Sequence, residues 1–246
     1  MIEGVTFDWW NTVARTSPEQ DQALRALRIE RMRPVLAGPS SARTIGDQEL
    51  FSAYDRQTEL LADAWARNVD LSPNEQIAAF LRFAGLDGHG ASAAGPLAEA
   101  FGGALLQIPP SLFPHVIESL EWLHREGYAV GLVSNTGRTW GRYLRRVQDD
   151  LGIGKYFDAR VFSDELGVRK PDRRIFEAAI ADLGLPPDRV VHVGDDVAAD
   201  VAGAKESGMR AVWFNTGFWK GVTTDRADAE IADHADLPAL LRRWRA

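Results

Sequence analysis

The sequence predicts an α/β fold: an open parallel sheet with helices on both faces, together with an inserted all-helical cap domain. Short apolar runs alternate with amphipathic stretches over most of the chain, which is the pattern of repeated βαβ units. Residues 16–112 differ, because they have helical periodicity and contain no convincing strand. This block follows the first apolar run, so we expect it to lie over the carboxyl edge of the sheet. We therefore assign residues 1–15 and 113–246 to the core and residues 16–112 to the cap.

Five apolar runs are the expected strands of the sheet. They are compact rather than alternating, as is typical of parallel strands that helices cover on both faces. Parallel strands are joined by right-handed crossovers, which place helices on the two sides of the sheet. The runs are Gly4–Phe7, Ala129–Ser134, Ala159–Phe162, Val190–Val193 and Ala211–Phe214.

Amphipathic stretches between these runs predict the helices that cover the sheet. Gly127, Gly184 and Gly208 stand just after three of the stretches, where a helix commonly ends in a left-handed residue. The expected helices are Val116–Glu126, Trp140–Leu151, Ile175–Leu183 and Val197–Ser207.

Residues 16–112 are expected to form four helices. Ser72 to Glu75 is a capping box with proline at the first helical position, and it predicts a helix that continues through Phe83. Stretches rich in glycine, alanine and serine at residues 37–46 and 85–95 predict loops. The other expected helices are Glu19–Met32, which Pro34 should end, Asp47–Ala66 and Pro96–Leu106.

Composition limits the classes of protein to consider. The 246 residues are 45% hydrophobic and 26% charged, the values of an ordinary globular chain. Without cysteine there is no disulfide, no thiolate zinc site and no cysteine nucleophile. A formal net charge of −7 disfavours nucleic acid as a partner, and no run approaches the roughly 20 apolar residues of a membrane span. We expect a cytoplasmic protein without a nucleic-acid or membrane partner, either a monomer or a homodimer.

Polar residues follow the carboxyl ends of the expected strands, where ligands bind in open α/β sheets. Asp8 follows the first strand, Ser134 ends the second and Asp195 follows the fourth, while Lys170 lies in a loop between them. Mg²⁺ prefers carboxylate and carbonyl oxygens, which suits Asp8 and Asp195. A strand-end carboxylate can act as a nucleophile once cations neutralise its charge and orient its target. Each of these residues taken alone is as consistent with a turn or a helix cap.

In this order and spacing, the motifs resemble the haloacid dehalogenase superfamily. The resemblance covers the whole chain and implies a Rossmann-like core with a type-1 helical cap. It also implies a closing strand at residues 230–233 and a closing helix at residues 237–241. The motifs are Phe7-Asp8-Trp9-Trp10-Asn11-Thr12, Val133-Ser134-Asn135-Thr136-Gly137, Arg169-Lys170-Pro171 and Gly194-Asp195-Asp196 with Asp200.

The resemblance implies a Mg²⁺-dependent phosphatase that hydrolyses a small phosphorylated metabolite through an aspartyl-phosphate intermediate. Asp8 would be the nucleophile, and Lys170 and Ser134 would complete the catalytic set by holding the phosphoryl group. Asp8, Asp195 and the main-chain carbonyl of Trp10 would hold the Mg²⁺. Candidates for substrate contact are Asn135, Asn11 and Thr12; Asp200 would support Lys170 or the metal loop, and Asn11 could instead simply tolerate an unusual backbone angle.

Trp10 departs from the phosphatase pattern, which has a second aspartate at this position as general acid and base. An indole can do neither, and such proton transfers contribute about 10²–10⁴-fold to the rate. Alkyl phosphate esters should therefore be poor substrates. Acyl phosphates, aryl phosphates and anhydrides should suffer less, because their leaving groups need no proton.

Two alternatives to a phosphatase remain open. The 2-haloacid dehalogenases have an aromatic residue at the position of Trp10, but they work without metal, and Asp195 would then add an uncompensated charge beside Asp8. A catalytically degenerate binding or scaffold protein is the other alternative. Phosphonoacetaldehyde hydrolases are excluded, because they need a lysine in the cap. The four lysines of this chain are at positions 155, 170, 205 and 220.

Overall fold

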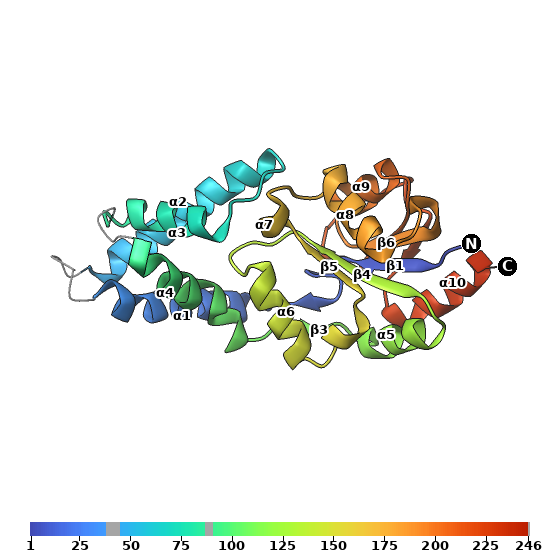
Figure 1. Cartoon of the computed structure of the whole chain (residues 1–246), viewed down its shortest axis with the longest axis horizontal. Coiled ribbons are helices and arrows are strands. Elements are labelled where there is room, and N and C mark those ends of the chain that lie inside the picture. The colour runs from blue at the N-terminus through green and yellow to red at the C-terminus, as the bar shows by residue number, and fades with distance from the viewer. Residues whose placement is uncertain (38–44, 87–90, 246) are drawn as a thin grey trace.

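The computed structural model describes residues 1–37, 45–86 and 91–245. The molecule is elongated, with a layer of helices at one end and a helix-flanked sheet at the other, where both termini lie (Figure 1). The sheet has six parallel strands in the order β5-β4-β1-β6-β7-β8, which confirms the predicted fold class. The strands are β1 (Gly4–Phe7), β4 (Ala129–Ser134), β5 (Ala159–Phe162), β6 (Val190–Gly194), β7 (Arg210–Phe214) and β8 (Ala229–Ile231).

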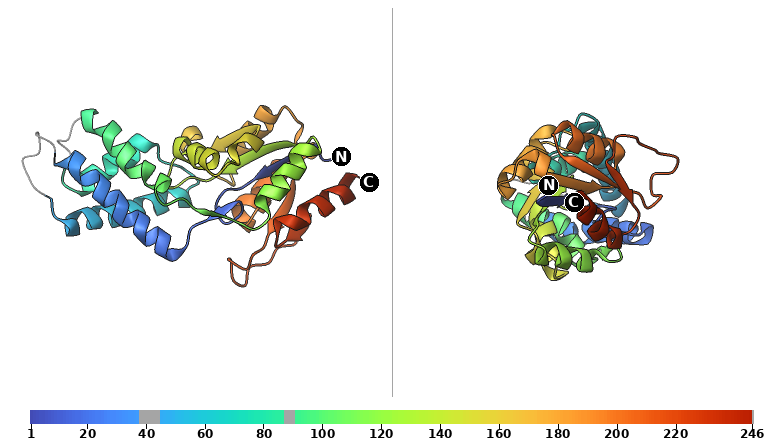
Figure 2. Two further views of the ribbon diagram at one scale, coloured as in Figure 1. Left: turned by 90° about the horizontal axis from the view of Figure 1, so that it is seen from below. Right: turned by 90° about the vertical axis from the view of Figure 1, so that its right-hand side faces the viewer.

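Two groups of helices cover opposite faces of the sheet (Figure 2). Three of the four predicted helices begin and end within about two residues of the observed bounds. Gly127, Gly184 and Gly208, which the sequence placed at helix ends, all have positive φ. On one face lie α5 (Val116–Arg125), α6 (Gly141–Asp150) and α10 (Leu237–Arg245). On the other lie α8 (Arg173–Leu183), the π-helical turn η4 (Val197–Ala202) and α9 (Gly203–Glu206).

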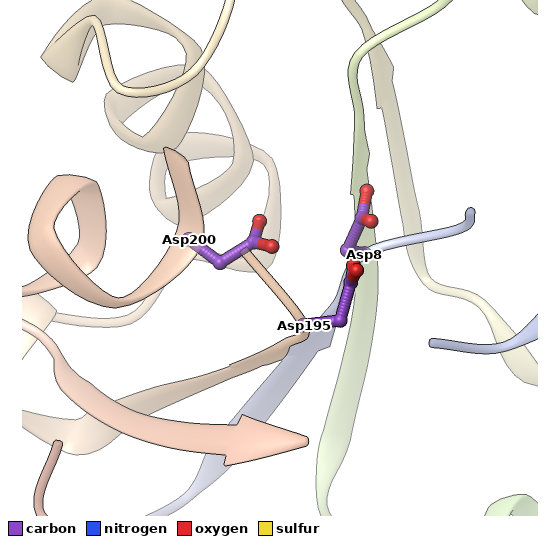
Figure 3. A group of neighbouring side chains, drawn as sticks. All are labelled: Asp8, Asp195 and Asp200. Atoms are coloured by element: carbon purple, nitrogen blue, oxygen red, sulfur yellow. The ribbon is translucent and has the colours of Figure 1, made fainter. Parts of the chain in front are cut away.

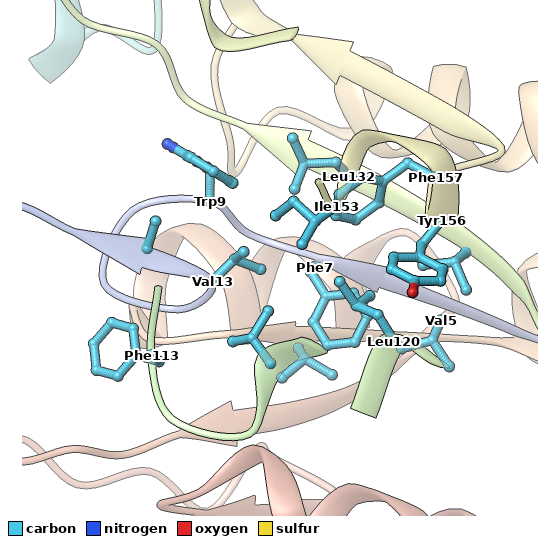
Figure 4. Close-up of a cluster of buried hydrophobic side chains, with 14 of the residues drawn as sticks. Val5, Phe7, Trp9, Val13, Phe113, Leu120, Leu132, Ile153, Tyr156 and Phe157 are labelled. Atoms are coloured by element: carbon cyan, nitrogen blue, oxygen red, sulfur yellow. The ribbon is translucent and has the colours of Figure 1, made fainter. Parts of the chain in front are cut away.

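Alternate residues of the central strands enter two separate cores, which explains why the strands are apolar throughout. Val5 and Phe7 of β1 pack in the core beneath α5 and α10 (Figure 4). Thr6 points to the other face, where its hydroxyl lies 2.9 Å from Nδ1 of His192 in β6. There the His192 ring meets Phe176 of α8 edge to face. Both faces are thus buried, and the Thr6–His192 contact lies on the face that α8 covers.

The chain passes from the sheet to the helical layer and back through two short antiparallel strands, β2 (Ala14–Arg15) and β3 (Ser111–Leu112). The sequence did not predict this pair, since two residues carry no periodicity. The layer has its own apolar core, which Trp140 and Tyr143 of the α6 region help to fill. Its helices are α1 (Pro18–Leu36), α2 (Asp47–Ala66), α3 (Pro73–Phe83) and α4 (Ala91–Gly102), followed by the 3₁₀ turn η1 (Gly103–Leu106).

Proline did not act as a boundary in either place where the sequence suggested one. Helix α1 continues past Pro34 to Leu36, and α4 begins at Ala91, so that Pro96 lies inside it. A proline costs one backbone hydrogen bond, but burial of Leu36 and of Phe101 in the layer core offsets that loss. The prediction that Pro96 starts a helix was therefore wrong, as was the prediction of a loop over residues 91–95. Residues 38–44 and 87–90 of the two predicted loops lie outside the described residues.

The predicted helix Val197–Ser207 is divided into η4 and α9. Asp196 caps this segment, its side chain accepting hydrogen bonds from Ala198 and Ala199. A π-helical turn is rare and occurs often at functional sites.

A short helix that the sequence did not predict, α7 (Ser163–Leu166), follows β5. Among the described residues, no helix combines the length and apolarity that crossing a membrane requires.

Candidate active site

The sheet brings three of the predicted site residues to one edge. Strand β1 lies between β4 and β6, and all three run in the same direction. Asp8, Ser134 and Asp195 therefore stand at neighbouring points of the carboxyl edge. The N–H of Asp8 still donates to the carbonyl of Val193 at 2.9 Å, so the last bond of the ladder positions this residue.

Lys170 is the cation at the centre of the site. Its Nζ lies 2.5 Å from Oδ1 of Asp8 and 2.6 Å from Oδ1 of Asp200, and it donates to the carbonyl of Val133 at 2.8 Å. All three charged side chains are buried. Removing one member of a buried ion pair typically costs about 3–5 kcal/mol, because its partner is left uncompensated. The three residues are therefore interdependent.

Asp200 is held from several sides. Its Oδ2 accepts the N–H of Asp196 at 3.0 Å, at the start of the π-helical turn. Its Oδ1 lies 3.1 Å from Nε2 of His192, whose other ring nitrogen meets Thr6. Asp200 thus connects Lys170 to the loop after β6. The sequence analysis gave His192 no role, because an apolar run does not show which face of the sheet its one polar side chain faces.

Asp195 is held by two tryptophans. The indole N–H of Trp213 donates to its main-chain carbonyl at 2.9 Å, and that of Trp219 donates to its Oδ2 at 2.8 Å. The hydroxyl of Thr12, a predicted substrate-contact residue, is fully buried and donates to Oδ1 of Asp195 at 3.4 Å. Trp219 had no sequence signal, since it lies in a loop far from any motif.

Burial and mutual repulsion determine the protonation of the cluster. Burial raises the pKa of Asp8 to about 7, and Lys170 only partly opposes this. Burial together with the charges of Asp8 and Asp200 raises the pKa of Asp195 to about 8. Although burial acts against it, the Lys170 ammonium keeps the pKa of Asp200 well below its usual range. Burial likewise opposes the charged form of Lys170, but Asp200 and Asp8 outweigh it and raise its pKa.

The donor set fits a divalent cation. Asp8, Asp195 and Asp200 each place one carboxylate oxygen within 4.8 Å of the other two (Figure 3). Three carboxylates face one ammonium group, which leaves a negative surplus in a buried place. Asp200 already accepts from three donors, so Asp8 and Asp195 are the carboxylates best suited to a cation. Mg²⁺ takes one or two carboxylates and keeps several waters, as this arrangement requires.

Ser134 and Asn135 have different surroundings. The Ser134 hydroxyl is buried and has no hydrogen-bond partner within the described part of the chain. It is thus a donor available to a bound oxyanion. The Asn135 side chain exchanges two hydrogen bonds with the backbone of Lys170, accepting at 2.8 Å and donating at 3.1 Å. It holds the lysine loop against the loop after β4.

Trp10 and Asn11 line separate cavities. The Trp10 side chain borders a cavity of about 210 Å³ between α1 and the loop after β4. Asn11 borders a second cavity, of about 450 Å³, and has a φ of +56°. Asparagine is among the few residues that adopt this left-handed conformation readily. Its N–H donates to Ala14 at 2.8 Å, so Asn11 forms the turn that leads into β2.

A buried aspartate that the sequence did not single out ties the helical layer to the site. Asp70, after α2, accepts from Arg169 at 2.9 Å, from Thr136 at 3.0 Å and from Ser163. Arg169 precedes Lys170, and Thr136 follows Asn135 in sequence. The layer therefore contacts both loops that carry candidate catalytic residues.

A parallel α/β sheet with buried carboxylates and a lysine at its carboxyl edge is the arrangement of a class of hydrolases with an α/β fold. Within that class, the chain belongs to the haloacid dehalogenase-like hydrolases, whose family model matches residues 2–208. The predicted superfamily is thereby confirmed.

Relatives with assigned names match part of the chain. A glyceraldehyde 3-phosphate phosphatase from Methanothermobacter thermautotrophicus is 40% identical over 106 residues, 42% of this chain and 45% of that protein. A phosphoserine phosphatase from Thermus thermophilus is 34% identical over 121 residues, 49% of this chain and 47% of that protein. The chain therefore matches about half the length of these relatives.

Solved structures match the whole chain. A 2-haloacid dehalogenase from Pseudomonas syringae pv. tomato is 28% identical with a TM-score of 0.72, over 99% of this chain and 100% of that one. A phosphatase of the same superfamily from Thermococcus onnurineus is 26% identical with a TM-score of 0.66, over 98% of both chains. The fold is thus common to dehalogenases and phosphatases.

The acidic cluster predicts that the metal-free protein loses stability as the pH rises. The raised pKa values of Asp8 and Asp195, about 7 and 8 against an ordinary 3.8, mean that the folded state binds more protons than the unfolded state between about pH 4 and pH 8. The melting temperature should fall from about pH 7 to about pH 8.5, and Mg²⁺ should restore it at the higher pH. Below about pH 7 the buried His192 and His234, whose pKa values burial lowers, act in the opposite direction. Thermal unfolding with and without Mg²⁺ measures both effects.

The matched variants are Asp195→Asn and Asp196→Asn. The first should remove most of the Mg²⁺ response and raise metal-free stability at about pH 8.5 by on the order of 1 kcal/mol. The second keeps a capping side chain at the adjacent position and should behave like the parent protein. Equal Mg²⁺ responses in the two variants would contradict Asp195 as a ligand.

Gly194 is predicted to be required for activity, because a Cβ there would lie 2.3 Å from Cγ of Asp200. Gly194→Ala should displace Asp200 and with it Lys170, and misplacement by about 1 Å can lower a rate by about 100-fold. Steady-state kinetics measures the loss. Gly95→Ala, where a Cβ meets open space, is the control and should leave activity unchanged. A Gly194→Ala variant of normal activity would show that the position of Asp200 is unimportant.

Proposed function

We propose that this protein is a Mg²⁺-dependent phosphatase that hydrolyses a small phosphorylated metabolite through an aspartyl-phosphate on Asp8. The observation that supports this most is the buried ammonium of Lys170, which contacts the Asp8 carboxylate while Asp195 lies beside them. A phosphoryl group approaching Asp8 needs positive charge around it, and Lys170 supplies one such charge. Mg²⁺ held by Asp8, Asp195 and the Trp10 carbonyl would neutralise more of the phosphoryl charge.

In the proposed reaction an oxygen of Asp8 forms a bond to phosphorus while the bond from phosphorus to the substrate oxygen breaks. Lys170 and the Ser134 hydroxyl, which has no partner among the described residues, bind the phosphoryl oxygens. Water then attacks the phosphorus of the intermediate, releasing phosphate and regenerating the Asp8 carboxylate. Asn135 and Asp200 keep Lys170 in position through its backbone and its ammonium, respectively.

Residues 16–112 act in this proposal as a cap domain that excludes water and selects the substrate. Support comes from the contacts of Asp70 with both catalytic loops and from the cavity that α1 shares with Trp10. The named relatives include phosphatases of glyceraldehyde 3-phosphate and of phosphoserine, both small phosphorylated metabolites. A substrate of that size is in keeping with a cavity of about 210 Å³.

A 2-haloacid dehalogenase is the second candidate function. It is favoured by the aromatic side chain of Trp10 and by the whole-chain similarity to a solved 2-haloacid dehalogenase. In such a reaction Asp8 would attack carbon and release halide, which needs no proton. Halide release from a 2-chloroacid in the presence of chelator would decide for this candidate, whereas phosphate release that requires Mg²⁺ would decide against it.

The phosphatase proposal predicts activity that depends strongly on the leaving group. Acetyl phosphate and aryl phosphates should be hydrolysed, and alkyl phosphates should be slower by about 10²–10⁴-fold, because Trp10 donates no proton to the leaving oxygen. Phosphate release across a panel of leaving-group pKa values, with and without Mg²⁺, measures this. Asp8→Asn should lose turnover of every substrate, and undiminished activity would remove the nucleophile assignment. If the parent protein released phosphate from no substrate of the panel, it would be a catalytically degenerate binding protein.

Trp10→Asp should selectively raise the hydrolysis of alkyl phosphates. The carboxylic acid supplies the proton that the indole cannot, so the gap between alkyl and aryl phosphates should narrow by about tenfold or more. The ratio of kcat/KM for an alkyl and an aryl phosphate measures the change. Trp10→Asn is the control, since it removes the ring without adding an acid. Equal ratios in the two variants would contradict this account of the missing proton donor.

A further inference from the structure

We propose that Arg28 and Arg138 form a subsite for a carboxylate at the end of the substrate away from the reacting group. The subsite is the cavity of about 210 Å³ that Trp10 borders, and it deepens the proposed function by naming the substrate class. Arg28 comes from α1, whereas Arg138 and Thr139 come from the loop after β4 that begins with Ser134 and Asn135. The cavity thus adjoins the loops that follow Asp8 and Ser134.

Arg28 is a buried cation that has no carboxylate partner among residues 1–37, 45–86 and 91–245. It is 7% exposed, and among the described residues its guanidinium bonds only to neutral groups. Nε donates to the Phe101 carbonyl at 3.3 Å, Nη1 to the Tyr54 hydroxyl at 3.1 Å, and Nη2 to the Thr139 hydroxyl at 3.1 Å. A buried charge that is not paired is costly, and proteins keep one where a ligand supplies the counter-charge.

Arg138 adds a second cation to the same cavity. Its guanidinium lies 4.3 Å from the centre of the Tyr54 ring and donates to Thr58, while its buried Nε has no partner within the described chain. Burial, together with the charge of Arg28, lowers the pKa of Arg138, so the site gains when an anion binds. Asp21 also borders the cavity, but it is exposed and accepts from Thr16. Two arginines and one aspartate leave the lining positive.

The neighbouring Arg25 shows the difference between a structural and an available arginine. Arg25 lies one turn from Arg28 on α1, and its guanidinium makes two bonds to Asp55, at 2.7 and 2.8 Å. Arg28 and Arg138 have no such partner in the described residues. The guanidinium fork matches a carboxylate, and a cavity of this volume has room for only a small acid. These features favour a carboxylate over a second, bulkier phosphate.

The experiment compares substrates that differ only in this charge. 4-Carboxyphenyl phosphate and 4-carbamoylphenyl phosphate have nearly the same shape and a leaving group that suits a site without a proton donor. We expect kcat/KM to favour the carboxylate by about 10- to 100-fold, the usual value of a charged hydrogen-bonded pair. Arg28→Gln should abolish this preference, measured as the ratio of kcat/KM for the carboxylate and the amide, and Arg138→Gln should reduce it. Arg25→Gln is the control and should keep it.

Other outcomes overturn the inference. An equal rate for the two substrates in the parent protein, or a preference that survives both Arg28→Gln and Arg138→Gln, would do so. A stronger preference for benzene-1,4-diyl bisphosphate would show that the subsite takes a phosphate instead. Should Arg28→Gln unfold, as thermal melting would show, Arg28→Lys and Arg138→Gln decide: the lysine retains the charge without the fork and should keep part of the preference.

A binding measurement separates this inference from the proposed phosphatase activity. Calorimetric titration of the metal-free protein with succinate should give a heat of binding that titration with succinamide does not. Arg28→Gln should weaken the affinity for succinate by about tenfold or more. Succinate binding without phosphatase activity would retain the subsite and refute the proposed function. Phosphatase activity without succinate binding or a carboxylate preference would do the reverse.

Discussion

The structure of the site depends on one buried ammonium group shared by two buried carboxylates. Lys170 cannot be taken out of water without Asp8 and Asp200, and neither carboxylate can be buried beside Asp195 without Lys170. This mutual requirement holds together three loops that are distant in sequence. It also leaves a negative surplus, so the arrangement is most favourable when a further cation is present. The metal-free site relieves this surplus by protonation, as the raised pKa values of Asp8 and Asp195 indicate, and a bound cation would relieve it in the proposed function.

Polar contacts with the helical layer extend this network away from the sheet. Asp70 is bonded to Arg169, next to Lys170, and to Thr136 in the loop after β4. Arg28 reaches Thr139 in the same loop. The same loop begins with the candidate phosphoryl-binding residues Ser134 and Asn135. Under the proposals made above, substrate selection and the positioning of the reacting residues would therefore share one stretch of backbone.

The sheet could be predicted because burial on both faces leaves a strong mark on the sequence, and strand ends then locate Asp8 and Asp195. The contact of His192 with Asp200 could not be predicted, since His192 looks like any polar residue in an apolar run. Proline rules failed at Pro34 because they count one local hydrogen bond and not the burial of the surrounding helix. Arg28 was missed for a related reason: on an amphipathic helix, only the packing tells whether an arginine faces solvent or a cavity.

Trp10 brings the chemistry and the specificity of the site into one argument. Trp10 borders the cavity that contains Arg28 and Arg138, and in the proposed reaction it stands where the phosphatase pattern has a proton donor. Under the proposed function, an indole there would offer the substrate apolar surface but no proton, so the leaving group would have to be stable as an anion. The arginines stabilise negative charge in the same cavity. A carboxylic acid that carries its phosphate as an anhydride, an enol ester or an aryl ester meets both conditions, whereas a simple sugar phosphate meets neither.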